Sequence, residues 1–221
     1  MTNELRAGLP PLPPKMQRLY IDRRGFPVPF FVAMVNGEPD HRVVDPRAMQ
    51  VCLRQFRCWI CGGPLGRFRS FTIGPMCALN RINSEPPSHL ECARYAMTAC
   101  PFLSRPHAKR REGGMPDQPL NQPAGVHLDR NPGVALIWTT RTFKPFKASD
   151  GVLFDLGPAE SMEWYAEGRA ATRAEIDESI ASGLQKLIEA AGVDRDENDL
   201  RELQRRIDEL RGVLDLAFAE A

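Results

Sequence analysis

The sequence lacks the short motifs by which several large enzyme classes are identified. It contains no G-x-x-x-x-G-K-[ST] or G-x-G-x-x-G segment, so neither a phosphate-binding loop nor a dinucleotide-binding fingerprint is present. It also contains no G-x-S-x-G nucleophile elbow and no H-E-x-x-H zinc-protease motif. These absences exclude the enzyme classes that depend on those motifs. They leave enzymatic activity open and favour a binding function.

Long apolar runs are also missing. No stretch approaches the roughly 20 residues that a transmembrane helix requires. The first residues, MTNELRAGLPPLPPK, lack the apolar core of a secretory signal. We therefore expect a protein of the cytoplasm with no membrane partner. Thiols stay reduced in that compartment, so the six cysteines are not expected to form disulfides.

The composition is that of a globular protein with an uneven distribution of charge. Hydrophobic residues make up 43% and charged residues 26% of the 221 residues, enough for one large domain or two small ones. Residues 41–111 carry 12 Lys/Arg against 3 Asp/Glu, whereas residues 151–221 carry 8 against 17. A basic half attracts phosphate groups, so nucleic acid is a candidate partner. Alternatively, the two halves face each other, or both are solvated.

The pattern of turns and apolar residues predicts an α+β protein in five segments. Residues 1–16 are expected to be a disordered Pro-rich tail, 17–103 a zinc-binding α+β domain and 104–125 a linker or long loop. Residues 126–170 are expected to form a small antiparallel sheet, and 171–221 a helical hairpin.

The zinc-binding segment should begin with a β-hairpin and a helix. Residues 30–35 and 41–44 are the predicted strands, joined at Asn36-Gly37, where both residue types tolerate positive φ. Pro46 opens a predicted helix that ends at about Arg57. Its expected apolar face consists of Met49, Leu53 and Phe56.

The C-terminal part should contain three strands followed by two helices. The strands are predicted at 134–142, 152–156 and 162–165. Thr172 and Glu175 have the spacing of a capping box at a helix start. The last helix carries a short heptad seam, which predicts packing on the preceding helix or a small dimer contact. The seam residues are Leu200, Leu203, Ile207, Leu210 and Leu214.

Two pairs of metal-ligand residues predict a zinc site. Cys58 and Cys61 form a Cys-x-x-Cys pair followed by two glycines, which allow a tight turn in the backbone. His89 and Cys92 lie three residues apart at a predicted helix start, with Ser88 as the expected N-cap. A strand candidate, residues 67–73, lies between the pairs. The order of turn, hairpin and helix is that of a treble clef, with Cys58, Cys61, His89 and Cys92 holding structural Zn²⁺.

Three other interpretations of these cysteines remain. They can be reduced core residues, because free cysteine is commonly buried. They can bind an iron–sulfur cluster, with Cys77 or Cys100 replacing His89. Cys58 and Cys61 can also be a redox-active pair, although the surrounding βαβ pattern is missing. Cys52, Cys77 and Cys100 are otherwise expected to be packed thiols, and Trp59 and Phe102 are expected to pack around the metal.

Three blocks of the sequence carry a resemblance to a known family. IGPMCALNRINSEPPSHLECARYAMTACPFLSRP, RNPGVALIW and WYAEGRAATRAE resemble a family of uncharacterised proteins from bacteriophages and prophages of proteobacteria. The resemblance implies a phage or prophage origin and a setting in the host cytoplasm. It implies no activity.

Two functions remain as hypotheses. The first is a zinc-stabilised phage accessory protein that binds nucleic acid through its basic half, or a protein partner or second copy through its C-terminal helix. The second is a nuclease or nucleotide-modifying enzyme that uses Asp129, Glu163 and Glu167. An HNH nuclease is disfavoured, because His89 would be consumed as a metal ligand and no other histidine precedes it in the predicted hairpin.

Overall fold

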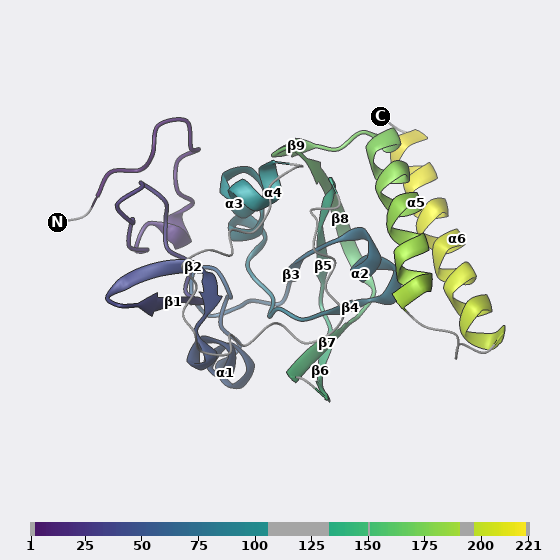
Figure 1. The fold of residues 1–221 in the computed structure, drawn as a ribbon, viewed down its shortest axis with the longest axis horizontal. Coiled ribbons are helices and arrows are strands. Elements are labelled where there is room, and N and C mark those ends of the chain that lie inside the picture. The colour runs from purple at the N-terminus through teal and green to yellow at the C-terminus, as the bar shows by residue number, and fades with distance from the viewer. Residues whose placement is uncertain (1–2, 106–132, 150, 191–196, 220–221) are drawn as a thin grey trace.

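The computed structural model describes residues 3–105, 133–149, 151–190 and 197–219 (Figure 1). It shows a mixed α+β fold with three small antiparallel sheets, which confirms the predicted class at that level. The helices are η1 (a 3-10 turn, Pro14–Met16), α1 (Pro46–Gln55), α2 (Pro75–Asn80), α3 (Leu90–Ala99), α4 (Pro101–Ser104), α5 (Arg173–Ala190) and α6 (Glu197–Ala219). The strands are β1 (Val32–Val35), β2 (Glu38–Val44), β3 (Arg69–Ile73), β4 (Ile82–Asn83), β5 (Ala135–Thr140), β6 (Phe143–Ala148), β7 (Gly151–Leu156), β8 (Ala159–Ala166) and β9 (Arg169–Ala170).

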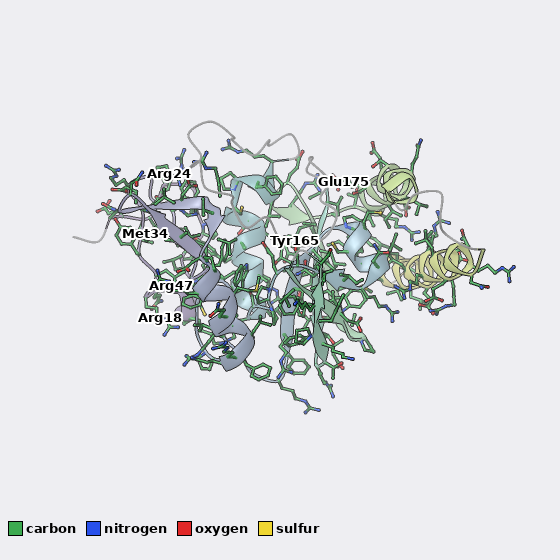
Figure 2. All side chains as sticks on the ribbon, turned by 60° about the horizontal axis from the view of Figure 1, so that its bottom comes forward. Arg18, Arg24, Met34, Arg47, Tyr165 and Glu175 are labelled. Carbon is green, nitrogen blue, oxygen red and sulfur yellow. The ribbon has the colours of Figure 1, made fainter. Side chains whose placement is uncertain are left out.

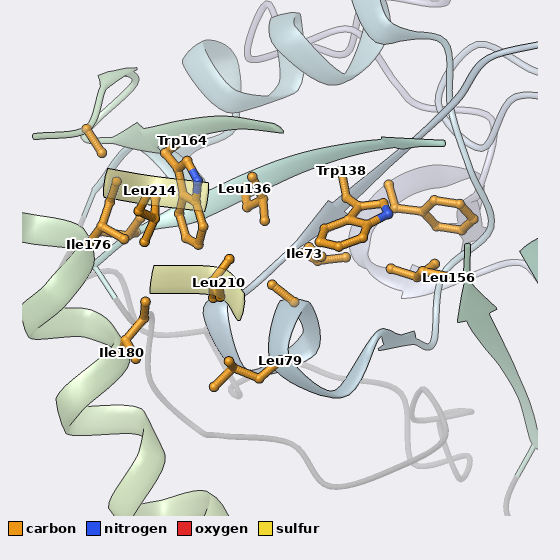
Figure 3. Close-up of a cluster of buried hydrophobic side chains, with 14 of the residues drawn as sticks. Ile73, Leu79, Leu136, Trp138, Leu156, Trp164, Ile176, Ile180, Leu210 and Leu214 are labelled. Atoms are coloured by element: carbon orange, nitrogen blue, oxygen red, sulfur yellow. The ribbon is translucent and has the colours of Figure 1, made fainter. Parts of the chain in front are cut away.

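The largest sheet has the order β3-β5-β8-β9 and is covered on both faces. Strand β5 shows this directly, because all six of its residues are buried and successive side chains point to opposite faces. Ala135 and Ile137 cluster with residues of α3. Leu136 and Trp138 belong to the main core with α2, α5 and α6 (Figures 1 and 3). The strand predicted at 134–142 is therefore present as β5, which is shorter than expected and fully buried.

The C-terminal strands do not form one sheet of their own. β8 pairs with β5, whereas β7 pairs with β4 and β6 in a separate sheet of order β4-β7-β6. Both sheets also take a strand from the predicted zinc-binding segment, since β3 pairs with β5 and β4 with β7. Pairing between distant strands is decided by tertiary packing, which the local pattern does not reveal. The five segment boundaries stay a prediction.

The predicted hairpin and helix near the N-terminus are present. β1 pairs with β2, and Asn36 and Gly37 both have positive φ, as the turn requires. Helix α1 begins at Pro46, and the Asp45 carboxylate caps it by accepting from the Arg47 N–H at 2.9 Å. The helix ends earlier than expected: Phe56 adopts a left-handed conformation after Gln55 and is 54% exposed, so it is not part of the apolar face.

The Pro-rich stretch at the N-terminus packs on the protein, and this corrects the expected disordered tail. Met16 is buried, and Leu9 and Leu12 pack against the same cluster, which includes Tyr95 of α3. Prolines hold this stretch extended at little entropic cost, while the leucines between them supply apolar contacts. Residues 3–16 thus cover part of the predicted zinc-binding segment.

The two C-terminal helices both contribute to the main core, and an ion pair between Arg173 of α5 and Asp215 of α6 joins them (Figure 1). The Thr172–Glu175 capping box is present: the Glu175 N–H donates to Thr172 Oγ1 at 3.3 Å, and the Thr172 N–H donates to the Glu175 carboxylate at 2.8 Å. Four of the predicted seam residues are buried in the main core: Leu203, Ile207, Leu210 and Leu214. No helix within the described ranges is both long and apolar enough to cross a bilayer.

Charged residues of both signs lie on the N-terminal elements and on the C-terminal helices, as the ion pairs Arg24–Asp22 and Arg205–Glu202 show. Figure 2 shows Arg18, Arg24 and Arg47 among the N-terminal elements, while Glu175 lies near the helical end. Most of the predicted linker, residues 104–125, lies outside the described residues.

The packing of α6 generates a stability prediction. Leu214 is 1% exposed and belongs to the main core, whereas Leu216 on the same helix is 72% exposed. We expect Leu214→Ala to lower the free energy of unfolding by about 2–5 kcal/mol, because it leaves a cavity among well-packed side chains. Leu216→Ala should change it by less than about 0.5 kcal/mol. Urea denaturation measures both, and equal effects would contradict the docking of α6.

Candidate metal centre

Cys58, Cys61, His89 and Cys92 come together in the structure. All four are buried, and their potential ligand atoms lie within 4.8 Å of one another. His89 Nδ1 is 3.3 Å from Cys61 Sγ and 3.8 Å from Cys92 Sγ. Elsewhere in the described part of the chain, no group of three or more Cys, His, Asp or Glu side chains converges in this way.

The first pair is held by a tight turn, which we call the knuckle (residues 58–63). The Cys58 N–H donates to the Gly63 carbonyl at 2.7 Å, and the Gly62 N–H donates to the Cys58 carbonyl at 2.8 Å. Gly62 has a φ of +66°, and a Cβ there would lie 2.7 Å from the Phe30 ring. The glycine is therefore required twice, by the backbone conformation and by the neighbouring ring.

Backbone amides of the centre point at sulfur atoms. The N–H groups of Cys61 and His89 both lie 3.4 Å from Cys58 Sγ, and the Gly63 N–H lies 3.4 Å from Cys61 Sγ. Hydrogen bonds to a charged group favour its ionised form. The folded backbone is thus arranged to stabilise thiolates at Cys58 and Cys61, which is the form in which cysteine binds metal.

The second pair is positioned by the start of α3. His89 is the N-cap of this helix and Cys92 lies in its first turn, where the positive end of the helix dipole favours a thiolate. The expected N-cap, Ser88, lies one residue too early. Its backbone instead exchanges two hydrogen bonds with Ser70 of β3, at 2.7 and 2.9 Å. This bridge joins the metal-ligand segment to the central sheet.

His89 presents one ring nitrogen to the sulfurs and the other to the backbone. Its Nε2 is 2.9 Å from the carbonyl oxygen of Pro64, so Nε2 carries the proton and donates to that oxygen. This leaves the Nδ1 lone pair facing Cys61 and Cys92. A hydrogen bond from the second nitrogen is the usual way in which proteins orient a metal-binding imidazole.

The chain between the two pairs differs from the predicted hairpin. It contains β3, α2 and β4, and the two strands pair with β5 and β7 rather than with each other. The knuckle and the helix that carries the second pair, α3, are present as predicted. The local hairpin of a treble clef is absent from the described residues between them, because β3 and β4 pair with distant strands. The treble-clef assignment stays a prediction.

The sulfurs influence one another's ionisation strongly. The pKa of Cys58 is lowered, chiefly by hydrogen bonds from the Cys61 and Cys92 side chains. Hydrogen bonding to Cys58 raises the pKa values of Cys61 and Cys92. One negative charge thus settles on Cys58 and opposes ionisation of its neighbours. A divalent cation among the sulfurs would remove this opposition.

The donor set and its spacing fit one tetrahedral metal ion. Zinc–sulfur bonds of about 2.3 Å and zinc–nitrogen bonds of about 2.0 Å place tetrahedral ligand atoms roughly 3.5–3.8 Å apart. The separations of 3.3 and 3.8 Å between His89 Nδ1 and two sulfurs are close to this range. Three cysteines and one histidine also form a common ligand set of structural zinc sites.

Two basic residues that sequence reasoning missed approach the centre from the N-terminal stretch. Arg18 Nη2 donates to the Cys61 carbonyl at 2.9 Å, and Lys15 forms an ion pair with Glu91 in α3. The pKa of Lys15 is raised, first by Glu91 and then also by Cys92 and Cys61. Three thiolates around a dication leave one net negative charge, which these cations help to offset. No sequence signal connected them to cysteines more than 40 residues away.

The remaining cysteines lie outside this group. Burial raises the pKa of Cys52 to about 12, and burial also raises the pKa values of Cys77 and Cys100. All three therefore stay protonated at neutral pH. Trp59 is buried against Ala48 and Cys52, whereas Phe102 is largely exposed and does not pack around the centre as expected.

The acidic residues considered for catalysis have structural partners in this fold. Glu163 accepts two hydrogen bonds from Arg94 of α3, at 2.6 and 2.8 Å, and a third from Tyr165. Glu167 lies at the turn between β8 and β9, with its carboxylate 3.9 Å from Arg169. Asp129 lies outside the described residues. Glu163 and Glu167 therefore give the enzymatic hypothesis no additional support.

The knuckle generates a prediction with a matched control. Gly62→Ala should lower the free energy of unfolding by more than about 1 kcal/mol, because alanine resists positive φ and its Cβ collides with Phe30. Gly66→Ala, four residues later, meets no atom within 4 Å and should have little effect. Thermal unfolding of the two variants makes the comparison. An equal loss in both would contradict the described knuckle.

Comparison with known proteins adds no further assignment to this geometry. No protein-family model matches the chain, and neither a curated protein nor a solved structure matches it.

Proposed function

We propose that the protein is a zinc-stabilised binding protein, with one structural Zn²⁺ held by Cys58, Cys61, His89 and Cys92. The observation that carries this proposal is the convergence of four buried ligand atoms within 4.8 Å from two distant parts of the chain. Thiolates and imidazole suit zinc better than magnesium or calcium, which prefer oxygen ligands.

The centre supports a structural role for the ion rather than a catalytic one. Catalytic zinc sites usually have three protein ligands and keep one position for water or substrate. Here four protein ligands are available, which fill a tetrahedral site. The ion would then contribute to folding by joining the knuckle to the start of α3. We propose that this module is a treble-clef variant whose strands pair outside the module.

The proposed partner is a nucleic acid or a protein, met in the host cytoplasm by a phage or prophage accessory protein. The phage origin is supported by the sequence resemblance alone. A nucleic-acid partner is supported by the excess of basic residues in 41–111. A protein partner or second copy is supported by the apolar side chains that α6 exposes, which are Val213, Leu216 and Phe218.

Metal analysis of ligand variants tests the zinc centre. We expect about one zinc per chain in the purified protein, and far less in Cys58→Ser and His89→Ala. Both variants should also lose about 4 kcal/mol or more of unfolding free energy, because loss of a structural metal is among the most destabilising changes. Elemental analysis and denaturant titration, made on the same samples, measure the two effects.

Cys100→Ser is the matched control, since Cys100 lies at the end of α3 but outside the ligand group. It should retain zinc and most of the stability. A wild-type protein that is fully folded without metal would contradict the proposal. Iron in the purified protein, lost in Cys77→Ser or Cys100→Ser, would show an iron–sulfur cluster instead.

A further inference from the structure

A groove lies between the end of α1 and the strands β3 and β6, apart from the metal centre. Its volume is about 320 Å³. Pro86 and Pro87 form part of its wall shortly before the candidate ligand His89, and the buried Phe154 also lines it. The side chains on which the following argument rests are Phe56, Arg69, Arg141 and Phe143, all of which line it.

Phe56 occupies its place in the groove at a cost to stability. It has a φ of +51° and is 54% exposed. Left-handed backbone is unfavourable for bulky residues, and the position after a helix is usually filled by glycine or asparagine. An exposed phenylalanine gains little from burial there. Neither the backbone nor the core therefore explains this aromatic ring, whereas a ligand that stacks on it would.

Arg69 is held in place at the groove wall, but not all of its guanidinium N–H groups have hydrogen-bond partners among the described residues. Its Nη1 donates to the carbonyls of Arg67 and Arg141 at 3.0 and 2.6 Å, and its guanidinium lies 5.8 Å from the centre of the Phe143 ring. Its buried Nε has no hydrogen-bond partner among the described residues. Nε and Nη2 form the edge by which arginine binds phosphate in a bidentate manner.

The surroundings of the groove combine aromatic rings with cations. The Arg141 guanidinium lies 5.3 Å from the centre of the Phe68 ring, which is 49% exposed. Lys147 follows Phe143 and Pro145 on the same face of β6, and no carboxylate of the described residues forms an ion pair with it. None of the residues that line the groove is acidic. Arg141 also forms an ion pair with Glu160 at 2.8 Å, at an exposed position.

We propose that this groove binds single-stranded nucleic acid, with bases stacked on Phe56 and Phe68 and phosphates contacted by Arg69, Arg141 and Lys147. Unpaired bases can stack on aromatic side chains, whereas the bases of a duplex are already stacked on each other. An acidic peptide would use the cations but not the exposed rings. The inference rests on the proposed function, because it names the partner and the surface of that binding protein.

Binding of labelled oligonucleotides to the zinc-loaded protein tests the groove. The probes are a DNA and an RNA strand of about 12 nucleotides, each also annealed to its complement. We expect either single strand to bind more tightly than its duplex, with a log–log salt slope of about −2 for three phosphate contacts. Fluorescence anisotropy measures the affinities, and metal content is determined on the same samples.

Variants separate the groove from general charge. Phe56→Asn should weaken single-strand binding about tenfold, because one stacking contact is lost, while its stability should be kept, since asparagine tolerates left-handed backbone. Tyr20→Asn removes an exposed aromatic side chain that does not line the groove and should leave binding unchanged. Arg69→Gln and Lys147→Gln should each weaken binding and make the salt slope shallower, unlike Arg211→Gln on α6. Lys147 is exposed, so its variant tests the charge without altering the core.

The inference fails if the protein with one zinc per chain binds no single strand at low salt. It also fails if duplexes or polyglutamate bind equally well, or if Phe56→Asn binds as the wild type does. None of these results changes the measured zinc content per chain. The zinc centre is therefore tested separately, by elemental analysis of the ligand variants.

Discussion

Mutual repulsion among buried thiolates is the constraint that the convergence of Cys58, Cys61 and Cys92 places on the N-terminal half of this structure. Two unit charges about 4 Å apart repel each other by roughly 4 kcal/mol at an effective dielectric constant of 20. Three ionised cysteines among Cys58, Cys61 and Cys92 therefore need a cation between them. The backbone amides aimed at two of these sulfurs reduce the cost of charge, and Lys15 and Arg18 reduce it further. A metal-loaded centre satisfies all of these features at once.

The centre is connected to the sheet through a short stretch of backbone. Ser88 precedes His89 and exchanges hydrogen bonds with Ser70, whose hydroxyl lies 2.9 Å from that of Thr139 in β5. Strand β5 in turn carries the main core on one face and the contacts with α3 on the other. The four candidate ligands are therefore joined to a fully buried strand within a few residues. Removal of the proposed ion would then affect the sheet as well as the knuckle.

The features that the sequence predicted have determinants within a few residues of each other. The Asn36-Gly37 turn, the Thr172–Glu175 capping box and the approximate positions of most helices belong to this class. The convergence of Cys58, Cys61, His89 and Cys92 was also predictable, because their spacing reflects the local geometry of a turn and a helix start. Whether those ligands hold zinc stays a proposal.

Other features depend on contacts that no local pattern records. Strand β6 was missed because its sequence, FKPFKA, shows no alternation, and an edge strand with one solvated side needs none. Pro145 is tolerated there because an edge strand leaves backbone groups unpaired. The pairing of β3 with β5 joins residues far apart in the chain, and the packing of Leu9 and Leu12 depends on a surface formed elsewhere. Helix α1 ends early, at Gln55. The left-handed backbone of Phe56 then turns its side chain to the groove, and not to the apolar face of the helix that the sequence predicted.

The knuckle and the groove share backbone contacts, which relates the proposed metal to the proposed ligand. Leu65, just after the knuckle, donates its N–H to the Phe56 carbonyl at 2.9 Å. The neighbouring Pro64 accepts from His89, and Arg57 forms a β-bridge with Pro64. A metal that fixes His89 and the knuckle would therefore also restrain the left-handed turn at Phe56, through the contacts of Pro64 and Leu65. Residues that violate a local preference are expected at functional sites supported by rigid surroundings. Rigid support for an exposed aromatic ring is thus a role that a closed structural metal site can have in binding.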